Sequence, residues 1–240
     1  MNFVLIGCKV LSRELYKLCA ESPHTVEIRW IEAALHERPG GLRPVLQREI
    51  DRIEGETPLK KVDAVLLGYG LCSMSIAGLK ARSIPLIVPR AHDCIAMLLG
   101  SRKRYAELFE AHGGGIYWYS PGWIEQFRVP GKQYDEQAKY ADYALKYGED
   151  NARYLIETEK SWTQRYELAA FIKWQGFDTE HFEQFTKEAA EKAALKYECI
   201  AGDEGLLKRF VDGDWNGDFC IVRPGQTLVY SMGPDILDAQ

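Results

Sequence analysis

Short, unbroken apolar runs recur along the first half of the chain, and amphipathic segments separate them. The clearest runs cover residues 2–7, 62–68 and 84–89, and Val, Leu and Ile dominate each of them. Such runs are typical of strands in a parallel sheet that is covered on both faces. The alternation of strand and helix predicts an α/β fold with a doubly wound, mostly parallel sheet.

The chain changes character after residue 120. Residues 121–195 are rich in Ala, Glu, Lys and Tyr, and we expect them to be helical and to form an insertion or cap. A length of 240 residues suits a single α/β domain, 1–240, that carries this insertion. Apolar side chains recur there at near-helical spacing, as at Trp162, Tyr166, Ala170 and Trp174.

Charge and hydropathy argue against several classes of protein. The formal net charge is −5 and no basic tract is present, so we expect no nucleic-acid partner. No apolar run approaches the roughly 20 residues that span a bilayer, so we expect no membrane span. The N-terminus lacks the basic region and cleavage site of a signal peptide, which predicts a cytoplasmic protein. In a cytoplasmic protein the six scattered cysteines of the chain are expected to be thiols or metal ligands rather than disulfides.

Three of these cysteines, Cys8, Cys72 and Cys94, each follow a predicted strand. Ligands of open parallel sheets bind beyond the carboxyl ends of the strands, so we expect the three side chains to share one crevice. Each also precedes a predicted helix, of which one begins at about Ser73. The positive end of a helix lowers the pKa of a nearby thiol, which favours thiolates here. Three thiolates in one crevice would repel one another unless a cation or cluster binds.

Iron–sulfur clusters and zinc both suit thiolate ligands. Three protein ligands leave a fourth position open, as in a reactive site. His92, Cys199 and Cys220 are the candidates for a fourth ligand. The chain has no C-x-x-C pair among these cysteines, and three other interpretations stay open: separate core thiols, a redox pair and a catalytic thiol.

Two polar residues beside Cys94 are candidates for catalysis. His92 is a candidate ligand or general acid, and Arg90 is a candidate for binding an anion or offsetting thiolate charge. The structural alternatives are an ordinary histidine and a surface salt bridge. Asp93, between them and the cysteine, is also a candidate helix cap.

Gly70, Trp118 and Trp123 are candidates for binding a cofactor. Gly70 lies in a predicted tight turn, where the lack of a side chain lets backbone approach a ligand closely. Trp118 lies at the end of the predicted strand at 116–119 and Trp123 lies just beyond it, and both rings suit stacking on an organic ligand. Packing against the helical cap is the alternative for both rings.

Four motifs together resemble a known family. They are Gly68-Tyr69-Gly70-Leu71-Cys72, Pro89-Arg90-Ala91-His92-Asp93-Cys94, Leu98-Leu99-Gly100-Ser101-Arg102, and Tyr117-Trp118 with Pro121-Gly122-Trp123. From Cys8 to the region of Pro224 the chain resembles the "domain of unknown function 1638" family. The resemblance implies no established catalytic residue. It implies a setting in anaerobic one-carbon or corrinoid metabolism, with a corrinoid protein or a methyltransferase as partner.

Three functions are consistent with these features, and the sequence does not decide whether the protein is an enzyme. In the first, Cys8, Cys72 and Cys94 hold an iron–sulfur cluster, [4Fe–4S], whose open iron binds a small molecule or a partner's cofactor. In the second, the same thiolates bind zinc, which activates a thiol for methyl transfer. In the third, the thiols are structural, and the protein is a non-catalytic accessory or binding protein for a corrinoid methyltransferase system.

Overall fold

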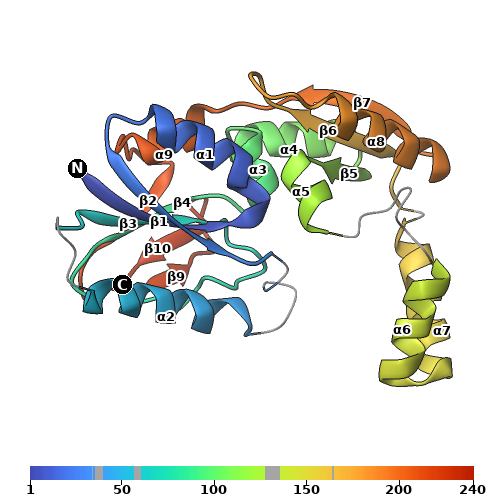
Figure 1. Cartoon of the computed structure of the whole chain (residues 1–240), viewed down its shortest axis with the longest axis horizontal. Helices are drawn as coiled ribbons and strands as arrows, with labels where there is room; N and C mark the ends of the chain where they lie inside the picture. The colour runs from blue at the N-terminus through green and yellow to red at the C-terminus, as the bar shows by residue number, and fades with distance from the viewer. Residues whose placement is uncertain (34, 36–39, 57–60, 128–135, 164) are drawn as a thin grey trace. The chain divides into compact units, whose positions relative to one another are not determined.

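The chain folds into two compact units. The computed structural model describes residues 1–33, 35, 40–56, 61–127, 136–163 and 165–240, with the backbone alone for 159–163. The first unit combines Met1–Tyr105 with Gly202–Gln240, and the second comprises Ala106–Ala201. The second unit contains the segment 121–195 that the sequence marks as an insertion or cap, and it has a sheet of its own. Figure 1 labels the helices and strands of both units.

The first unit is built on a five-stranded sheet with the order β2-β1-β3-β4-β8. β1 to β4 run parallel, and β8 pairs with β4 in the antiparallel direction. This arrangement confirms the predicted α/β fold with a mostly parallel sheet. The strands are β1 (Asn2–Cys8), β2 (Thr25–Ile31), β3 (Ala64–Gly68), β4 (Leu86–Pro89) and β8 (Phe219–Val222).

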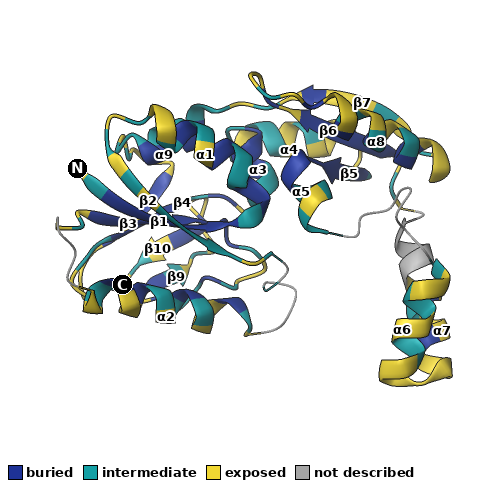
Figure 2. Ribbon diagram, in the orientation of Figure 1, coloured by how far each residue is buried: buried dark blue, intermediate teal, exposed yellow. Residues whose placement is uncertain are grey.

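Helices cover both faces of this sheet. Figure 1 shows α1 and α9 on one face and α2 on the other. Every residue of β3 and β4 is buried as a result, and these strands are dark blue in Figure 2. Among the described residues, no helix is both long enough and apolar enough to cross a bilayer. The unit also contains η1 (Lys9–Leu11), α1 (Ser12–Glu21), α2 (Leu42–Gly55), α3 (Cys94–Leu98), α9 (Gly205–Val211) and a hairpin of β9 (Leu228–Tyr230) and β10 (Leu237–Ala239).

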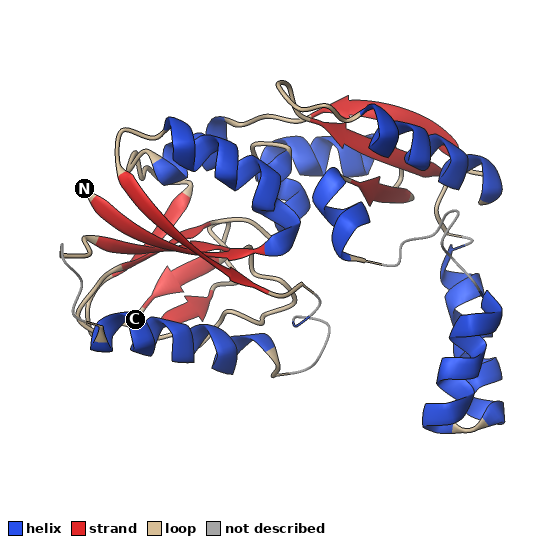
Figure 3. Cartoon of the chain, in the orientation of Figure 1, coloured by secondary structure: helices blue, strands red, loops and turns tan. Residues whose placement is uncertain are grey.

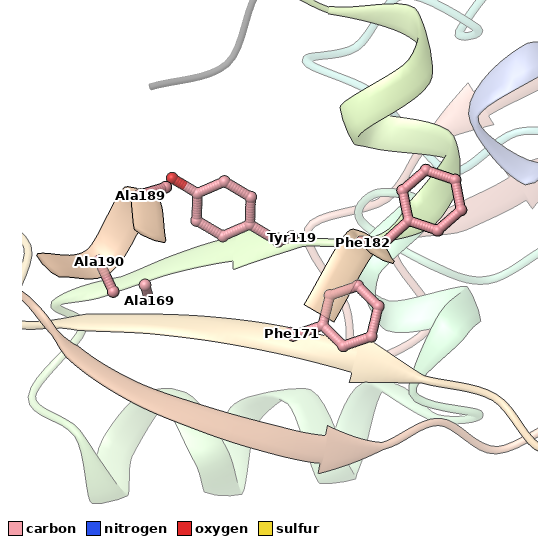
Figure 4. Packing of buried hydrophobic residues seen from close by; sticks show 6 residues of the cluster. All are labelled: Tyr119, Ala169, Phe171, Phe182, Ala189 and Ala190. Carbon is pink, nitrogen blue, oxygen red and sulfur yellow. The ribbon is translucent and has the colours of Figure 1, made fainter. Parts of the chain in front are cut away.

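The second unit has a three-stranded parallel sheet in the order β5-β6-β7. Its core lies between β5, β6 and the helix α8, where Tyr119, Phe171 and Phe182 pack with three alanines (Figure 4). Figure 3 distinguishes its strands from its helices. The strands are β5 (Ile116–Tyr119), β6 (Leu168–Lys173) and β7 (Lys196–Ala201). The helices are α5 (Pro121–Gln126), α6 (Glu136–Tyr147), α7 (Glu149–Thr163) and α8 (Glu180–Lys192). The boundary between the two units falls within a further helix, α4 (Arg102–Ala111).

The prediction of helix throughout 121–195 is wrong at β6. All residues of this strand except Lys173 are buried, and its apolar run is short. Periodicity alone does not separate such a run from a buried helix segment, and the spacing of Tyr166, Ala170 and Trp174 favours a helix. The side chain of Trp162, from the same pattern, lies outside the described residues. Pairing with β5 and β7 makes this segment a central strand.

Candidate functional site

The strand order of the first sheet reverses between β1 and β3. The chain leaves β1 for β2 on one side, and leaves β3 for β4 on the other. Such a switch point opens a crevice at the carboxyl ends of the strands, which is where open α/β sheets bind ligands. Cys8 ends β1 and Cys72 follows β3, so these two residues flank the switch point. Cys94 follows the neighbouring strand β4 and begins α3.

All six cysteines of the chain are free thiols. Cys8 is buried, and Cys72 and Cys94 are half-buried. Burial raises the pKa of each of these three thiols, to about 12 for Cys72. Mutual repulsion adds to this effect: Cys8 raises the pKa of Cys72, and both raise the pKa of Cys94. The three predicted cysteines therefore lie within one electrostatic environment.

The direction of these pKa shifts is opposite to the expected one. The sequence predicts that helix N-termini stabilise thiolates, but burial disfavours the charged form more strongly. At Cys8 a hydrogen bond from the backbone of Val10 offsets the effect of burial only in part. Without a bound metal the thiols are protonated near neutral pH, so metal binding would have to displace protons. In the described part of the chain, no group of three or more His, Cys, Asp or Glu side chains is arranged to hold a single metal ion.

A strained left-handed turn positions Cys72. Cys72, Ser73 and Met74 have φ angles of 46°, 55° and 67°, so the helix predicted from about Ser73 is absent from this described segment. The left-handed region costs a non-glycine residue about 1–2 kcal/mol. A hydrogen bond from the Ser75 amide to the Leu71 carbonyl, 3.1 Å long, closes the turn. Consecutive strained residues of this kind concentrate at functional sites.

The loops that carry Cys72 and Cys94 are joined backbone to backbone. The Leu71 amide donates to the Ala91 carbonyl at 2.8 Å, and the Cys72 amide donates to the His92 carbonyl at 2.9 Å. Gly70 makes this pairing possible, because a Cβ atom there would lie 2.7 Å from the Asp93 nitrogen. Gly70, expected from the sequence to approach a ligand, thus approaches the neighbouring loop.

Asp93 caps the helix that begins at Cys94, as one interpretation of the sequence predicts. Its Oδ1 accepts a hydrogen bond of 3.0 Å from the Ala96 amide. Burial raises the pKa of Asp93, and the amides of Ala96 and Ile95 and the exposed His92 oppose that shift. The Asp93 carboxylate in turn adds to the raised pKa of Cys72 and Cys94.

Arg90 makes its contacts with the C-terminal segment. Its Nε donates to the Phe219 carbonyl at 3.3 Å, and its Nη1 donates to the carbonyls of Asp235, at 3.1 Å, and Leu237. Burial raises the pKa of Cys220, and Arg90 is the main opposing influence. Among the described residues, the groups that shift the pKa of Cys8, Cys72 and Cys94 include no arginine. The observed role of Arg90 is to hold the chain terminus to β8.

Trp118 and Trp123 belong to the second unit. Trp118 is buried in β5, and Trp123 packs against the core of that unit. The Trp123 ring lies over Phe127, with 4.0 Å between ring centroids. These contacts agree with the packing alternative for the two tryptophans.

Tyr69 is the site residue that the sequence did not single out. It follows β3 directly and is 2% exposed. Its hydroxyl is buried and has no hydrogen-bond partner among the described residues. Burial raises the pKa of this phenol, and Cys8 and Cys72 raise it further. No spacing pattern marks such a residue, because its significance comes from the two cysteines near it.

Comparisons with known proteins identify a family. A search of curated proteins found no match, and a search of solved structures found none either. The model of a family described as "Protein of unknown function (DUF1638)" matches residues 30–211, which include Cys72 and Cys94 but not Cys8. This match spans well over half of the 240 residues, so the chain belongs to the DUF1638 family.

Proposed function

We propose that Cys8, Cys72 and Cys94 hold an iron–sulfur cluster of the [4Fe–4S] type and leave one iron open to a small ligand. The observation that carries the proposal is the placement of three free thiols at or just beyond the carboxyl ends of β1, β3 and β4, which are neighbouring parallel strands. Among the described residues, the groups acting on these thiols include no cation that would offset three thiolates. Bound iron would supply the missing positive charge.

The donor set fits this group. Cysteine thiolates are the usual ligands of iron–sulfur clusters. Thiolates around one zinc ion lie roughly 4 Å apart, whereas a four-iron cluster spreads its ligand sulfurs to roughly 6–7 Å. The described residues offer no compact set for one ion, yet the three thiols still interact. Metal analysis distinguishes the two groups.

Two residues of the first unit, His92 and Cys220, remain candidates for a fourth ligand or for proton transfer at the open position. His92 is exposed, and it lies close enough to Asp93 to oppose the rise in the pKa of Asp93. An exposed imidazole in this place suits a proton donor at the edge of the site. Cys220 is buried on β8 beside Arg90. Cys199 is exposed in the second unit. The substrate class that would use the open iron includes the corrinoid and one-carbon compounds implied by the family resemblance.

The test is anaerobic purification of the full chain, followed by reconstitution and analysis of iron and sulfide. We expect about four of each per chain and a broad brown absorption. Cys72→Ser should lose most of the iron, whereas Cys19→Ser, which changes a cysteine of α1, should retain it. Substoichiometric iron after careful reconstitution contradicts the proposal. Colourless protein with one zinc per chain would favour the zinc-thiolate alternative.

The accessory-protein alternative requires an exposed apolar surface and thiols with no ligand role. Trp118 and Trp123 do not supply that surface, since Trp118 is buried and Trp123 packs on the core. Exposed large side chains instead lie on the helical hairpin of α6 and α7, at Leu145, Tyr147 and Tyr154. Partner binding that survives replacement of all three cysteines by Ser would favour this alternative.

A further inference from the structure

The Tyr69 hydroxyl is a buried polar group whose hydrogen bond is missing. The side chain is 2% exposed, and no partner for its oxygen exists among the residues that the structure describes. Burying a hydroxyl without a partner is unfavourable, and each such group in a folded protein calls for a bound water, ion or ligand. The hydroxyl therefore needs a hydrogen-bond acceptor that the described part of the polypeptide does not provide.

The position of Tyr69 indicates where that acceptor lies. Its amide donates to the Leu67 carbonyl at 2.8 Å, which turns the chain sharply at the end of β3. Gly7 of β1 pairs with Gly68 of β3, so Cys8 and Tyr69 are the next residues along these two adjacent strands, and Cys72 lies three residues beyond Tyr69. Cys8 and Cys72 flank the switch point of the sheet. Tyr69 thus lies at the carboxyl ends of β1 and β3, beside the switch point.

The Tyr69 hydroxyl is suited to donate a hydrogen bond. A phenol has an ordinary pKa of about 10, so the Tyr69 hydroxyl carries its proton at physiological pH. A protonated thiol is a weak acceptor, but a thiolate or a sulfide accepts hydrogen bonds well. An acceptor suited to Tyr69 therefore arises when the cysteines lose their protons and bind iron.

We propose that Tyr69 donates a hydrogen bond to a sulfur of the loaded site, either a ligating thiolate of Cys8 or Cys72 or a sulfide of the cluster, and raises its reduction potential. This inference rests on the proposed iron–sulfur function. Hydrogen bonds to cluster sulfurs stabilise the more negative, reduced state and are a recognised means of tuning potential. Tyr69 is accordingly a positioning residue and not an iron ligand.

The experiment compares the midpoint potential of the reconstituted full chain with that of Tyr69→Phe, by anaerobic redox titration. We expect equal iron and sulfide in the two proteins and a more negative potential in the variant. Tyr119→Phe is the matched control, because Tyr119 is also 2% exposed but lies in the core of the second unit. Its potential should equal that of the wild type.

Equal potentials in Tyr69→Phe and wild type, at equal iron content, would overturn the inference and leave the iron–sulfur proposal standing. Failure of the wild type to bind iron would overturn both. If the variant does not fold, the hydrogen bond is tested in the wild type alone. Electron–nuclear double resonance of the reduced cluster is then compared between samples in H2O and D2O. A strongly coupled exchangeable proton supports the hydrogen bond, and its absence contradicts it.

Discussion

Gly70 and Asp93 approach each other so closely that a Cβ atom at position 70 would lie 2.7 Å from the Asp93 nitrogen and 2.8 Å from its Cα. Both are backbone atoms, so neither can rotate out of the way. This contact presses the loop after β3 against the loop after β4. The separation of Cys72 and Cys94 therefore depends on the absence of a side chain at position 70.

Gly70→Ala should separate the two loops and reduce iron loading. We expect a destabilisation of about 1–3 kcal/mol, the range for inserting a methyl group into close packing. Denaturant unfolding of the metal-free protein and iron analysis after reconstitution measure the two effects. Gly55→Ala is the control, since a Cβ there meets no atom of the described residues within 4 Å. Unchanged stability and iron content in Gly70→Ala would contradict this account of the loops.

Replacing Cys8, Cys72 or Cys94 by Ser should in each case remove most of the iron that the reconstituted protein binds. Cys72→Ser should change the stability of the metal-free protein by less than about 1 kcal/mol, because the residue is half-buried and its replacement is nearly isosteric. Iron analysis and thermal unfolding measure both quantities. Cys19→Ser serves as the control. A loss of iron from Cys19→Ser as large as from Cys72→Ser would indicate that the thiols are generic packing residues.

Ser73→Gly should stabilise the protein by about 0.5–1 kcal/mol. Glycine relieves the left-handed strain of about 1–2 kcal/mol. Its greater freedom in the unfolded chain lowers the stability of the folded protein by about 0.5–1 kcal/mol. Ser73→Ala keeps the Cβ atom and should give no gain. Denaturant unfolding of the three proteins checks this prediction, and a stability order with Ala above Gly would argue against strain at φ 55°.

Thiol alkylation should follow burial and pH. In the metal-free protein Cys199, which is exposed, should react with iodoacetamide first, and Cys72 should react slowly at pH 7.5. The Cys72 pKa of about 12 means that its rate should rise about tenfold per pH unit until the pH nears that value. Mass spectrometry of quenched samples gives the rate for each residue. Labelling of Cys72 as fast as Cys199 at pH 7.5 would rule out the raised pKa.

The raised pKa of Cys72 also predicts how stability depends on pH. The folded state holds the proton more tightly than the unfolded state, whose thiol has the ordinary value of 9.0. The contribution of this group to stability is thus complete below about pH 9 and is lost as the pH rises toward 12, by at most about 1.4 kcal/mol per pH unit. Cys72→Ser should lose less stability than the wild type over this window. Equal losses would mean that the thiol titrates alike in both states.

Tyr69→Phe should raise the stability of the metal-free protein, by up to about 1–3 kcal/mol, because the substitution removes a buried hydroxyl with no described partner. Iron loading should reverse the sign of the difference, since the wild type then gains a hydrogen bond that the variant lacks. Thermal unfolding of both proteins, with and without reconstitution, measures the change. A destabilised metal-free variant would point to an ordered water bound to Tyr69.

The sequence by itself determined the kind of sheet and the edge at which the cysteines lie. Continuous apolar runs dictate strands covered on both faces, and parallel strands bring their carboxyl ends to one edge, so Cys8, Cys72 and Cys94 follow from pattern alone. The helix cap at Asp93 is equally local, because it depends on residues within one turn.

The tertiary structure decided the burial, the contacts and the ionisation of those residues. Four features depend on segments distant in the chain: the raised pKa of the thiols, the left-handed turn at Cys72, the contacts of Arg90 with the C-terminal segment, and the Tyr69 hydroxyl, which has no hydrogen-bond partner among the described residues. The same is true of β6, which is a strand because β5 and β7 flank it. Burial and pairing are properties of three-dimensional neighbours, and for short apolar segments and ionisable groups they outweigh local preference.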